Sequence, residues 1–182
     1  NAGTMYSAKN QKLILNAMSL LNIGDYDFTI LGNGELTETL RTQAKDLGLD
    51  NHFHQLGKVS DVKAHLIEHD CFILSSDTEG FPNVLLEALS VGLPVISTNC
   101  LSGPLEMLND NEPVDISEGE FVKAKYGLLV NVNDPLGMSK AINYYLVHPE
   151  KRAKYSELAF ERAKLYAMPK IYNQVKDLLL NK

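Results

Sequence analysis

Two carboxylates, Glu79 and Glu87, bound the segment EGFPNVLLE, and their types and spacing point most directly to chemistry. A short apolar run ends at Ser75 just before them, and Pro82 is suited to the first positions of a helix. This order predicts a strand, then a loop that carries Glu79, then a helix whose first turns carry Glu87. Both side chains could then reach one pocket. Spacing alone leaves an alternative open, in which Glu79 caps its own loop and Glu87 faces solvent.

The start of this predicted helix is suited to bind an anion. Its first backbone N–H groups, at Asn83, Val84 and Leu85, have no acceptor within the helix, and the helix dipole adds partial positive charge at the same end. A diphosphate fits such a site. Carboxylates beside a phosphate are compatible with it when they accept hydrogen bonds from neutral hydroxyls, as sugars and riboses supply.

Further polar features follow other predicted strands. Gly32 and Gly34 form a strand-to-helix turn that allows close approach of a ligand, although such turns also occur wherever a strand reverses sharply. Residues 99–104 (NCLSGP) form a polar turn that should border the same cleft. Lys9 lies before the first helix, where a cation would neutralise a phosphate. The alternative for Lys9 is a solvated surface position.

Short apolar runs that alternate with helical patterns position these loops. Buried parallel strands are expected at residues 26–31, 52–56, 71–75, 94–98 and 127–130, with a further strand at 1–5. Expected helix caps are Ser7, either Ser60 or Asp61, and, at the C-terminal ends, Gly48 and Gly92. The alternation predicts an α/β fold with a doubly wound, Rossmann-like parallel sheet of about six strands and helices on both faces.

The rest of the chain fits one domain covering residues 1–182. From about residue 134 a helical tail is expected, in three pieces broken near Pro149 and Pro169. Residues 101–125 are acidic and loosely patterned, and a solvated loop around one short helix is expected there.

Composition excludes several classes of function. The net charge of −6 and the pI near 5.3 argue against a nucleic-acid partner. Cys71 and Cys100 have no His or Cys neighbour at ligand spacing, which predicts buried thiols in a reducing compartment and no metal site. No apolar run approaches the ~20 residues that a transmembrane helix needs.

The segment EGFPNVLLEA, followed by LSVGLPVIST, closely resembles the Glu-x7-Glu motif of the group 1 glycosyltransferases (glycosyltransferase family 4), which have the GT-B fold. The opening helix after Lys9, the stretches LGNGE and FHQLGKV and the closing helices follow in the family's order. Only the Glu-x7-Glu motif is specific by itself. The resemblance implies that this chain is the C-terminal, donor-binding domain, and that an N-terminal acceptor-binding domain is absent from it.

The resemblance also assigns roles to single residues. Glu79 and Lys9 would be the catalytic residues, with Glu79 beside the donor sugar and Lys9 on the phosphates. Glu87 would bind the ribose hydroxyls. The family usually has an Arg at the position of Thr4, so either this member lacks one diphosphate contact or the alignment is shifted at this position. The remaining expected donor-binding residues are Gly32, Gly34, Lys58, Val59, Gly80, Phe81, Pro82, Asn83, Val84 and Leu85, with Lys58 and Val59 bordering the nucleobase.

The implied reaction transfers a hexosyl or N-acetylhexosaminyl group from a nucleotide diphosphate sugar, with a UDP-sugar expected, and retains the anomeric configuration. No metal or cofactor is implied. A saccharide or lipid-linked acceptor would bind through the missing domain, in bacterial polysaccharide or oligosaccharide biosynthesis. The chain alone is expected to bind donor weakly and not to turn over. A cytoplasmic location is expected, with any attachment to the inner face of the membrane made through the missing domain.

Two alternatives remain. One is a nucleotide-binding module without catalysis, which only Thr4 favours. The other is a sugar-nucleotide epimerase of the same fold, which needs acid/base residues around the sugar. The sequence offers no convincing pairing of a histidine with a carboxylate for that role among His52, His54, His65 and His69.

Overall fold

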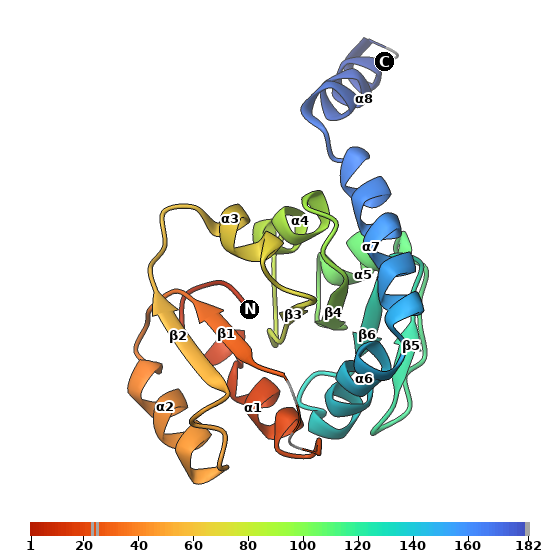
Figure 1. The fold of residues 1–182 in the computed structure, drawn as a ribbon. Coiled ribbons are helices and arrows are strands. Elements are labelled where there is room, and N and C mark those ends of the chain that lie inside the picture. Colours follow the sequence, from red (N-terminus) through yellow and green to blue (C-terminus); the bar gives the residue numbers. More distant parts are fainter. Residues whose placement is uncertain (23, 25, 181–182) are drawn as a thin grey trace.

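The computed structural model describes residues 1–22, 24 and 26–180 and confirms the predicted alternation of strands and helices (Figure 1). The five strands expected between residues 26 and 130 are all present, and one more was not expected. The strands are β1 (Phe28–Leu31), β2 (Phe53–Gly57), β3 (Phe72–Leu74), β4 (Val95–Thr98), β5 (Phe121–Lys123) and β6 (Leu128–Val130). The helices are the 3-10 turn η1 (Ser7–Lys9), α1 (Lys12–Met18), α2 (Thr37–Asp46), α3 (Val62–Ile67), α4 (Asn83–Ser90), α5 (Pro104–Asn109), α6 (Pro135–Val147), α7 (Pro149–Lys164) and α8 (Met168–Leu180).

The strands form two sheets in place of the single sheet that the sequence predicted. β1 pairs with β2 in parallel, and a second sheet has the order β3-β4-β6-β5. The unexpected strand β5 runs antiparallel to β6 and lies in the acidic stretch that was predicted to be a loop. That prediction was wrong for residues 121–123, because Phe121 packs against the Tyr144 ring of α6, with 5.4 Å between ring centroids.

Residues 1–5 lie between the two sheets and do not form the sixth strand that was expected. Only Ala2 pairs there, as an isolated parallel bridge to Leu31. The Asn1 side-chain nitrogen donates to the Ile73 carbonyl oxygen of β3 at 2.8 Å, so the segment links β1 to β3. A pocket of about 430 Å³ lies beside it and is lined by Asn1, Phe28, Ile73 and residues that precede β1 and β3. This pocket is therefore on the side where the strands begin.

Helices cover both faces of the second sheet, which confirms the doubly wound α/β class. One face is covered by α3, α4, α5 and α7, and the other by α1 and α6, all through buried apolar side chains. Helix α1 also contributes to a separate core with β1, β2 and α2, through Ile14 and Leu15. The helix therefore packs against both sheets.

The helix ends agree only in part with the predicted caps. Gly48 and Gly92 have φ of +70° after α2 and α4, as expected of C-terminal caps, and Asp61 accepts the Ala64 N–H at 3.0 Å to cap α3. Ser7 was wrongly expected to cap the first helix. It begins the 3-10 turn η1, which ends at the left-handed residue Asn10 before α1 starts.

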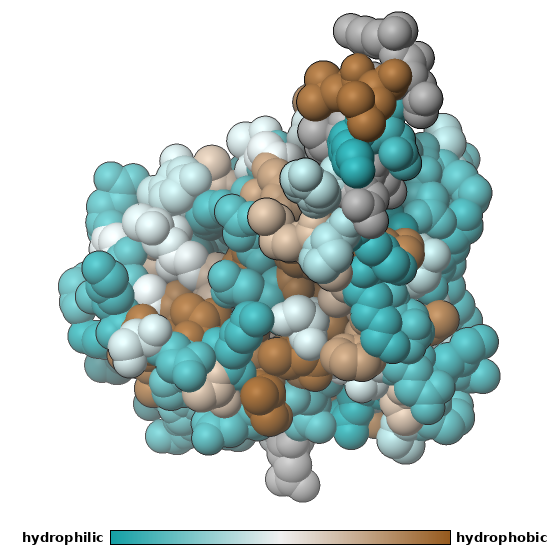
Figure 2. All heavy atoms as spheres, turned by 90° about the horizontal axis from the view of Figure 1, so that it is seen from above, coloured by the Kyte–Doolittle hydropathy of each residue, from teal (hydrophilic) through white to brown (hydrophobic). Residues whose placement is uncertain are grey.

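The three helical pieces after residue 134 are confirmed, and α8 extends beyond the rest of the molecule (Figure 1). Met168, Tyr172 and Leu179 of α8 are exposed. Viewed from above, the molecule has hydrophilic residues around its rim and hydrophobic ones nearer its middle and on α8 (Figure 2). None of the helices in the described ranges is long and apolar enough to cross a membrane.

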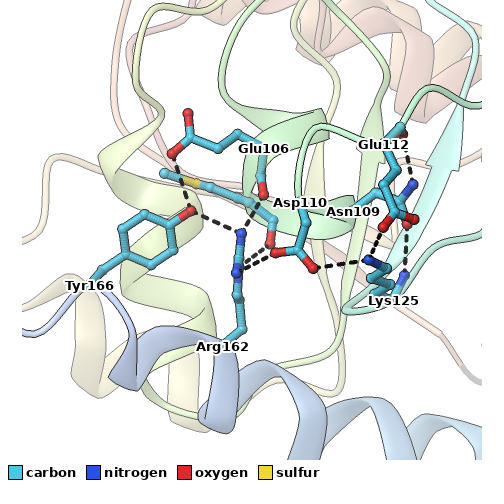
Figure 3. A network of polar contacts seen from close by, with 8 residues as sticks. Glu106, Asn109, Asp110, Glu112, Lys125, Arg162 and Tyr166 are labelled. Atoms are coloured by element: carbon cyan, nitrogen blue, oxygen red, sulfur yellow. Dashed lines mark hydrogen bonds and ion pairs between the residues drawn. The ribbon is translucent and has the colours of Figure 1, made fainter.

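Arg162 of α7 is 6% exposed and fixes α7 against α5 (Figure 3). Its guanidinium donates to the backbone oxygens of Glu106 and Met107 in α5 and pairs with Asp110 at 2.7 Å. It also lies over the ring of Tyr166, with 5.2 Å to the centroid. A planar, charged group is needed to make all of these contacts at once.

We predict that Arg162→Lys lowers the free energy of unfolding by about 2 kcal/mol or more, because lysine cannot reproduce the fork of hydrogen bonds to Glu106 and Met107 together with the pair to Asp110. Urea denaturation measures this. The matched control on the same helix is Arg152→Lys, whose partly exposed pair with Asp70 (3.4 Å) should cost below about 0.5 kcal/mol. Equal losses in the two variants would contradict the importance of the Arg162 contacts.

Candidate functional site

Lys9 and Glu79 meet at the side of the sheet where the strands end. The Lys9 ammonium lies 2.6 Å from Glu79 Oε1, and the Ser76 hydroxyl donates to the same oxygen at 2.6 Å. The Glu79 side chain is 8% exposed and that of Lys9 is 21% exposed. The Lys9 ammonium and the Glu79 carboxylate, which are far apart in sequence, are thus held together where water has little access.

Backbone contacts bring these two side chains together. The Asp77 N–H donates to the Ala8 carbonyl oxygen and the Ser75 hydroxyl donates to the Lys9 carbonyl oxygen, both at 2.8 Å. On the other side, the Thr98 hydroxyl at the end of β4 donates to the Ser76 carbonyl oxygen at 2.6 Å. The segment before α1 and the loop after β3 therefore form one unit.

Helix α4 begins directly after this loop, as the sequence predicted. Pro82 is its N-cap, with no side-chain cap. The Leu85 N–H donates to the Pro82 carbonyl oxygen at 2.9 Å, so the expectation of a free amide at Leu85 was wrong. Within the described part of the chain, no acceptor is found for the N–H groups of Asn83 and Val84. These two amides remain available to an anion.

Glu87 lies one turn further along α4 and is half-buried. Among the described residues, none donates a hydrogen bond to its carboxylate or forms an ion pair with it. The carboxylate is therefore free to accept hydrogen bonds from a ligand. Gly80 is exposed, while the ring of Phe81 packs edge-on against Tyr166 of α7, with 5.9 Å between centroids.

The glycines at positions 32 and 34 let two segments of this chain pass closely. A Cβ atom at Gly32 would lie 2.1 Å from the Gly3 carbonyl oxygen, and one at Gly34 would lie 2.2 Å from the Met5 carbonyl oxygen. This close approach favours the purely structural explanation of the turn. A ligand contact at either glycine stays a prediction.

The remaining positions considered in the sequence, all of them described residues, make no hydrogen bond or ion pair with Lys9 or Glu79. Lys58 is exposed after β2, whereas Val59 is half-buried and packs against the core of the second sheet. Thr4 is exposed, and its carbonyl oxygen accepts the Gln11 side-chain amide at 3.4 Å. Their roles in binding stay predictions.

The cysteines and the metal prediction can be compared with the structure. Both thiols are free. Burial raises the pKa of the Cys71 thiol to about 12 and also raises the pKa of Cys100, which therefore stays protonated near neutral pH. Over residues 1–22, 24 and 26–180, no group of three or more His, Cys, Asp or Glu side chains is arranged to hold a metal ion.

Sequence reasoning missed the residues that support the pair. The sequence predicts Ser75 only as the end of a strand and assigns no role to Ser76 or Asn10, although an asparagine that ends a short turn is a signal for a left-handed residue. Gly103 was named only as a turn residue. Its φ is +86°, and a Cβ there would lie 2.4 Å from Pro82 Cδ and 3.1 Å from the Gly80 oxygen.

We predict that Gly103→Ala is more destabilising than Gly48→Ala. Both positions have positive φ, which costs about 1–2 kcal/mol for alanine. A Cβ at Gly48 meets open space, whereas one at Gly103 pushes Pro82 and the Glu79 loop away from α5. An extra loss of about 2 kcal/mol or more is expected for Gly103→Ala in urea denaturation. Similar losses in the two variants would show that the loop does not depend on this close packing.

Comparisons of the sequence and of the fold with those of known proteins point to one family. A family model described as glycosyl transferases group 1 matches residues 1–162. A Campylobacter jejuni protein is 29% identical over 180 residues, 99% of this chain and 46% of that protein, and is named N-acetylgalactosamine-N,N'-diacetylbacillosaminyl-diphospho-undecaprenol 4-alpha-N-acetylgalactosaminyltransferase. The uncharacterized glycosyltransferase MJ1059 of Methanocaldococcus jannaschii is 34% identical over 135 residues, 71% of this chain and 32% of that protein.

Among solved structures, Alr3699/HepE of Anabaena in complex with UDP-glucose superimposes with a TM-score of 0.80 at 21% identity, over 100% of this chain and 48% of that one. This likeness shows the fold. The chain spans about half or less of the length of these relatives. The family match over residues 1–162, together with the fold shared with GT-B enzymes, shows that this chain belongs to the group 1 glycosyltransferases.

Proposed function

We propose that this chain binds the donor of a retaining glycosyltransferase, a nucleotide diphosphate sugar, around Lys9, Glu79 and the start of α4. The observation that carries the proposal is the contact between Lys9 and Glu79 (2.6 Å) on the loop that leads into the uncapped N-terminus of α4. A cation, a carboxylate and two available amides are thereby gathered at one edge of the sheet. This combination suits an anionic group attached to a sugar.

In this proposal the diphosphate competes with Glu79 for Lys9. Two phosphates carry more negative charge than one carboxylate, so the Lys9 ammonium turns to them while the amides of Asn83 and Val84 donate to the same oxygens. Glu79 stays held by the Ser76 hydroxyl and can accept a hydrogen bond from a sugar hydroxyl. Stabilisation of the departing diphosphate is then the main catalytic contribution of this chain.

Glu87 provides the second hydroxyl-binding group, for the ribose. It lies on the same helix as the proposed phosphate-binding amides, and its carboxylate is not neutralised by a cation in the described part of the chain. An uncharged diol is therefore a suitable partner. Lys58 and Val59 would border the base.

The relatives indicate the classes of donor and acceptor. The name of the Campylobacter jejuni relative specifies N-acetylgalactosaminyl transfer to a saccharide carried on undecaprenol diphosphate, and the Anabaena crystal contains UDP-glucose. By analogy, we propose a UDP-sugar as donor and a lipid-linked saccharide as acceptor, in surface-polysaccharide biosynthesis at the cytoplasmic face of a membrane. Since the chain spans about half of its relatives, the acceptor side of the cleft would belong to a second domain, and the chain alone would bind donor without transferring it.

The positions of the histidines support an epimerase less well than a glycosyltransferase. His52 and His54 lie 3.1 and 3.6 Å from Asp27, a residue that precedes β1 at the other end of the strands from Glu79. No contact of Lys9 or Glu79 within the described residues involves a histidine.

We predict that Lys9→Met weakens UDP binding by about ten- to a hundredfold, because a charge-assisted phosphate contact of about 1.5–3 kcal/mol is lost. Isothermal titration calorimetry on the full-length protein measures the Kd. Lys12→Met, at an exposed lysine on the first turn of α1, is the control and should bind UDP normally. Unchanged affinity in Lys9→Met would contradict the proposed phosphate site.

Glu87→Ala should separate ribose binding from phosphate binding. We expect the Kd for UDP to rise about tenfold, the loss of one or two hydrogen bonds to a charged acceptor, while the Kd for inorganic diphosphate stays within about twofold. Glu157→Ala, at an exposed glutamate of α7, is the matched control. Equal weakening of both ligands in Glu87→Ala would show that Glu87 does not bind the ribose.

A further inference from the structure

Asn10 is buried and holds an unusual backbone conformation at the end of η1. It is 2% exposed, with φ +46° and ψ +42°, in the left-handed region. Glycine adopts this conformation with the least strain, and asparagine tolerates it. The backbone alone therefore does not explain an asparagine here, so its side chain must be considered.

The Asn10 side chain links the segment before α1 to the loops that follow two strands. Its Nδ2 donates to Asp77 Oδ1 at 2.7 Å and to Asn133 Oδ1 at 2.8 Å. Asp77 follows β3 and Asn133 follows β6, while Asn10 itself precedes α1. Because a carboxylate only accepts hydrogen bonds, the nitrogen of the Asn10 amide must face Asp77. Both hydrogens of the amide are then used.

The bond between Asn10 and Asp77 lies close in sequence to both members of the ion pair, because Lys9 directly precedes Asn10 and Glu79 follows Asp77 by two residues. Ala8 and Lys9 accept hydrogen bonds from Asp77 and Ser75 through their carbonyl oxygens. The Asn10–Asp77 bond joins the same two segments through two side chains. Lysine has a long, flexible side chain, so the position of its ammonium group depends on how firmly its backbone is held.

We propose that Asn10 is a positioning residue that holds Lys9 opposite Glu79 by joining the Asp77 and Asn133 loops. This proposal depends on the proposed function in one respect, namely that Lys9 binds a phosphate of the donor. Asn10 does not touch the donor and acts through Lys9. Asparagine suits this position because its neutral amide nitrogen donates to the acceptor oxygens of both Asp77 and Asn133.

Charge makes a specific test possible. Asn10→Asp places a carboxylate against that of Asp77, which should push the two loops apart. The double variant Asn10→Asp/Asp77→Asn reverses the direction of the hydrogen bond, because the amide introduced at position 77 donates to the carboxylate introduced at position 10. Rotation of the Asn133 amide by about 180° offers its nitrogen to the same carboxylate. Asn10→Gly keeps the left-handed backbone and removes only the side-chain bonds.

The experiment measures three quantities for each variant of the full-length protein: the ¹H–¹⁵N NMR signal of the Lys9 ammonium without ligand, the Kd for UDP, and the midpoint of thermal unfolding. Asn10→Gly should lose the Lys9 signal to solvent exchange and raise the Kd about tenfold. Asn10→Asp should also lose the Lys9 signal and should raise the Kd for UDP further than Asn10→Gly does. The double variant should recover the signal and bring the Kd within about threefold of the original. Asn111→Gly, at an exposed left-handed asparagine, is the matched control and should change neither quantity.

Several outcomes would overturn the proposal. A retained Lys9 signal and unchanged Kd in Asn10→Gly would do so, as would a double variant no better than Asn10→Asp. A lower melting midpoint without any change in signal or Kd would reduce Asn10 to a structural role and also overturn it. If the unsubstituted protein binds no UDP while the Lys9 signal still depends on Asn10, positioning is supported and the proposed function is contradicted.

Discussion

The contact between the segment before α1 and the loop after β3 is the constraint on which the candidate site depends. Parallel strands end at the same edge of a sheet, so the residues that follow them are gathered there whatever their distance in sequence. Here the carbonyl oxygens of Ala8 and Lys9 accept hydrogen bonds from the β3 loop. Because these backbone groups are paired, the Lys9 and Glu79 side chains can meet in a shielded place. In the proposed function, a phosphate replaces Glu79 as the partner of Lys9 while the loops keep their backbone contacts.

The same loop is supported from its other side by close packing. Gly103 allows α5 to approach Pro82, and Arg162 ties the C-terminal carbonyl groups of α5 to α7. The ring of Tyr166, beside Arg162, also contacts Phe81. The order of support therefore runs from a buried guanidinium on α7, through a short helix, to the loop that carries Glu79. Rigid support of this kind fits a site that must bind charge without reorganisation.

The sequence predicted the alternating elements well, because short aliphatic runs and glycine caps are local signals. It did not predict β5, whose acidic surroundings hide a strand that is held by pairing with β6 and by the Phe121–Tyr144 contact. The separate sheets and the occupied amide of Leu85 also depend on contacts beyond local pattern. Spacing suggested Glu79 and Glu87, and its position before the first helix suggested Lys9. The family resemblance then favoured these roles over the purely structural alternatives. The bonds of Asn10 to Asp77 and Asn133 bring together positions distant in sequence, and only the fold reveals them.

The central claim is that the donor binds where the strands end and not in the 430 Å³ pocket where they begin. A crystal structure of the full-length protein with UDP tests it most directly. The account predicts a diphosphate within hydrogen-bonding distance of the Lys9 ammonium and the amides of Asn83 and Val84, with the ribose on Glu87. A nucleotide bound in the other pocket, with the Lys9–Glu79 pair intact, would contradict it.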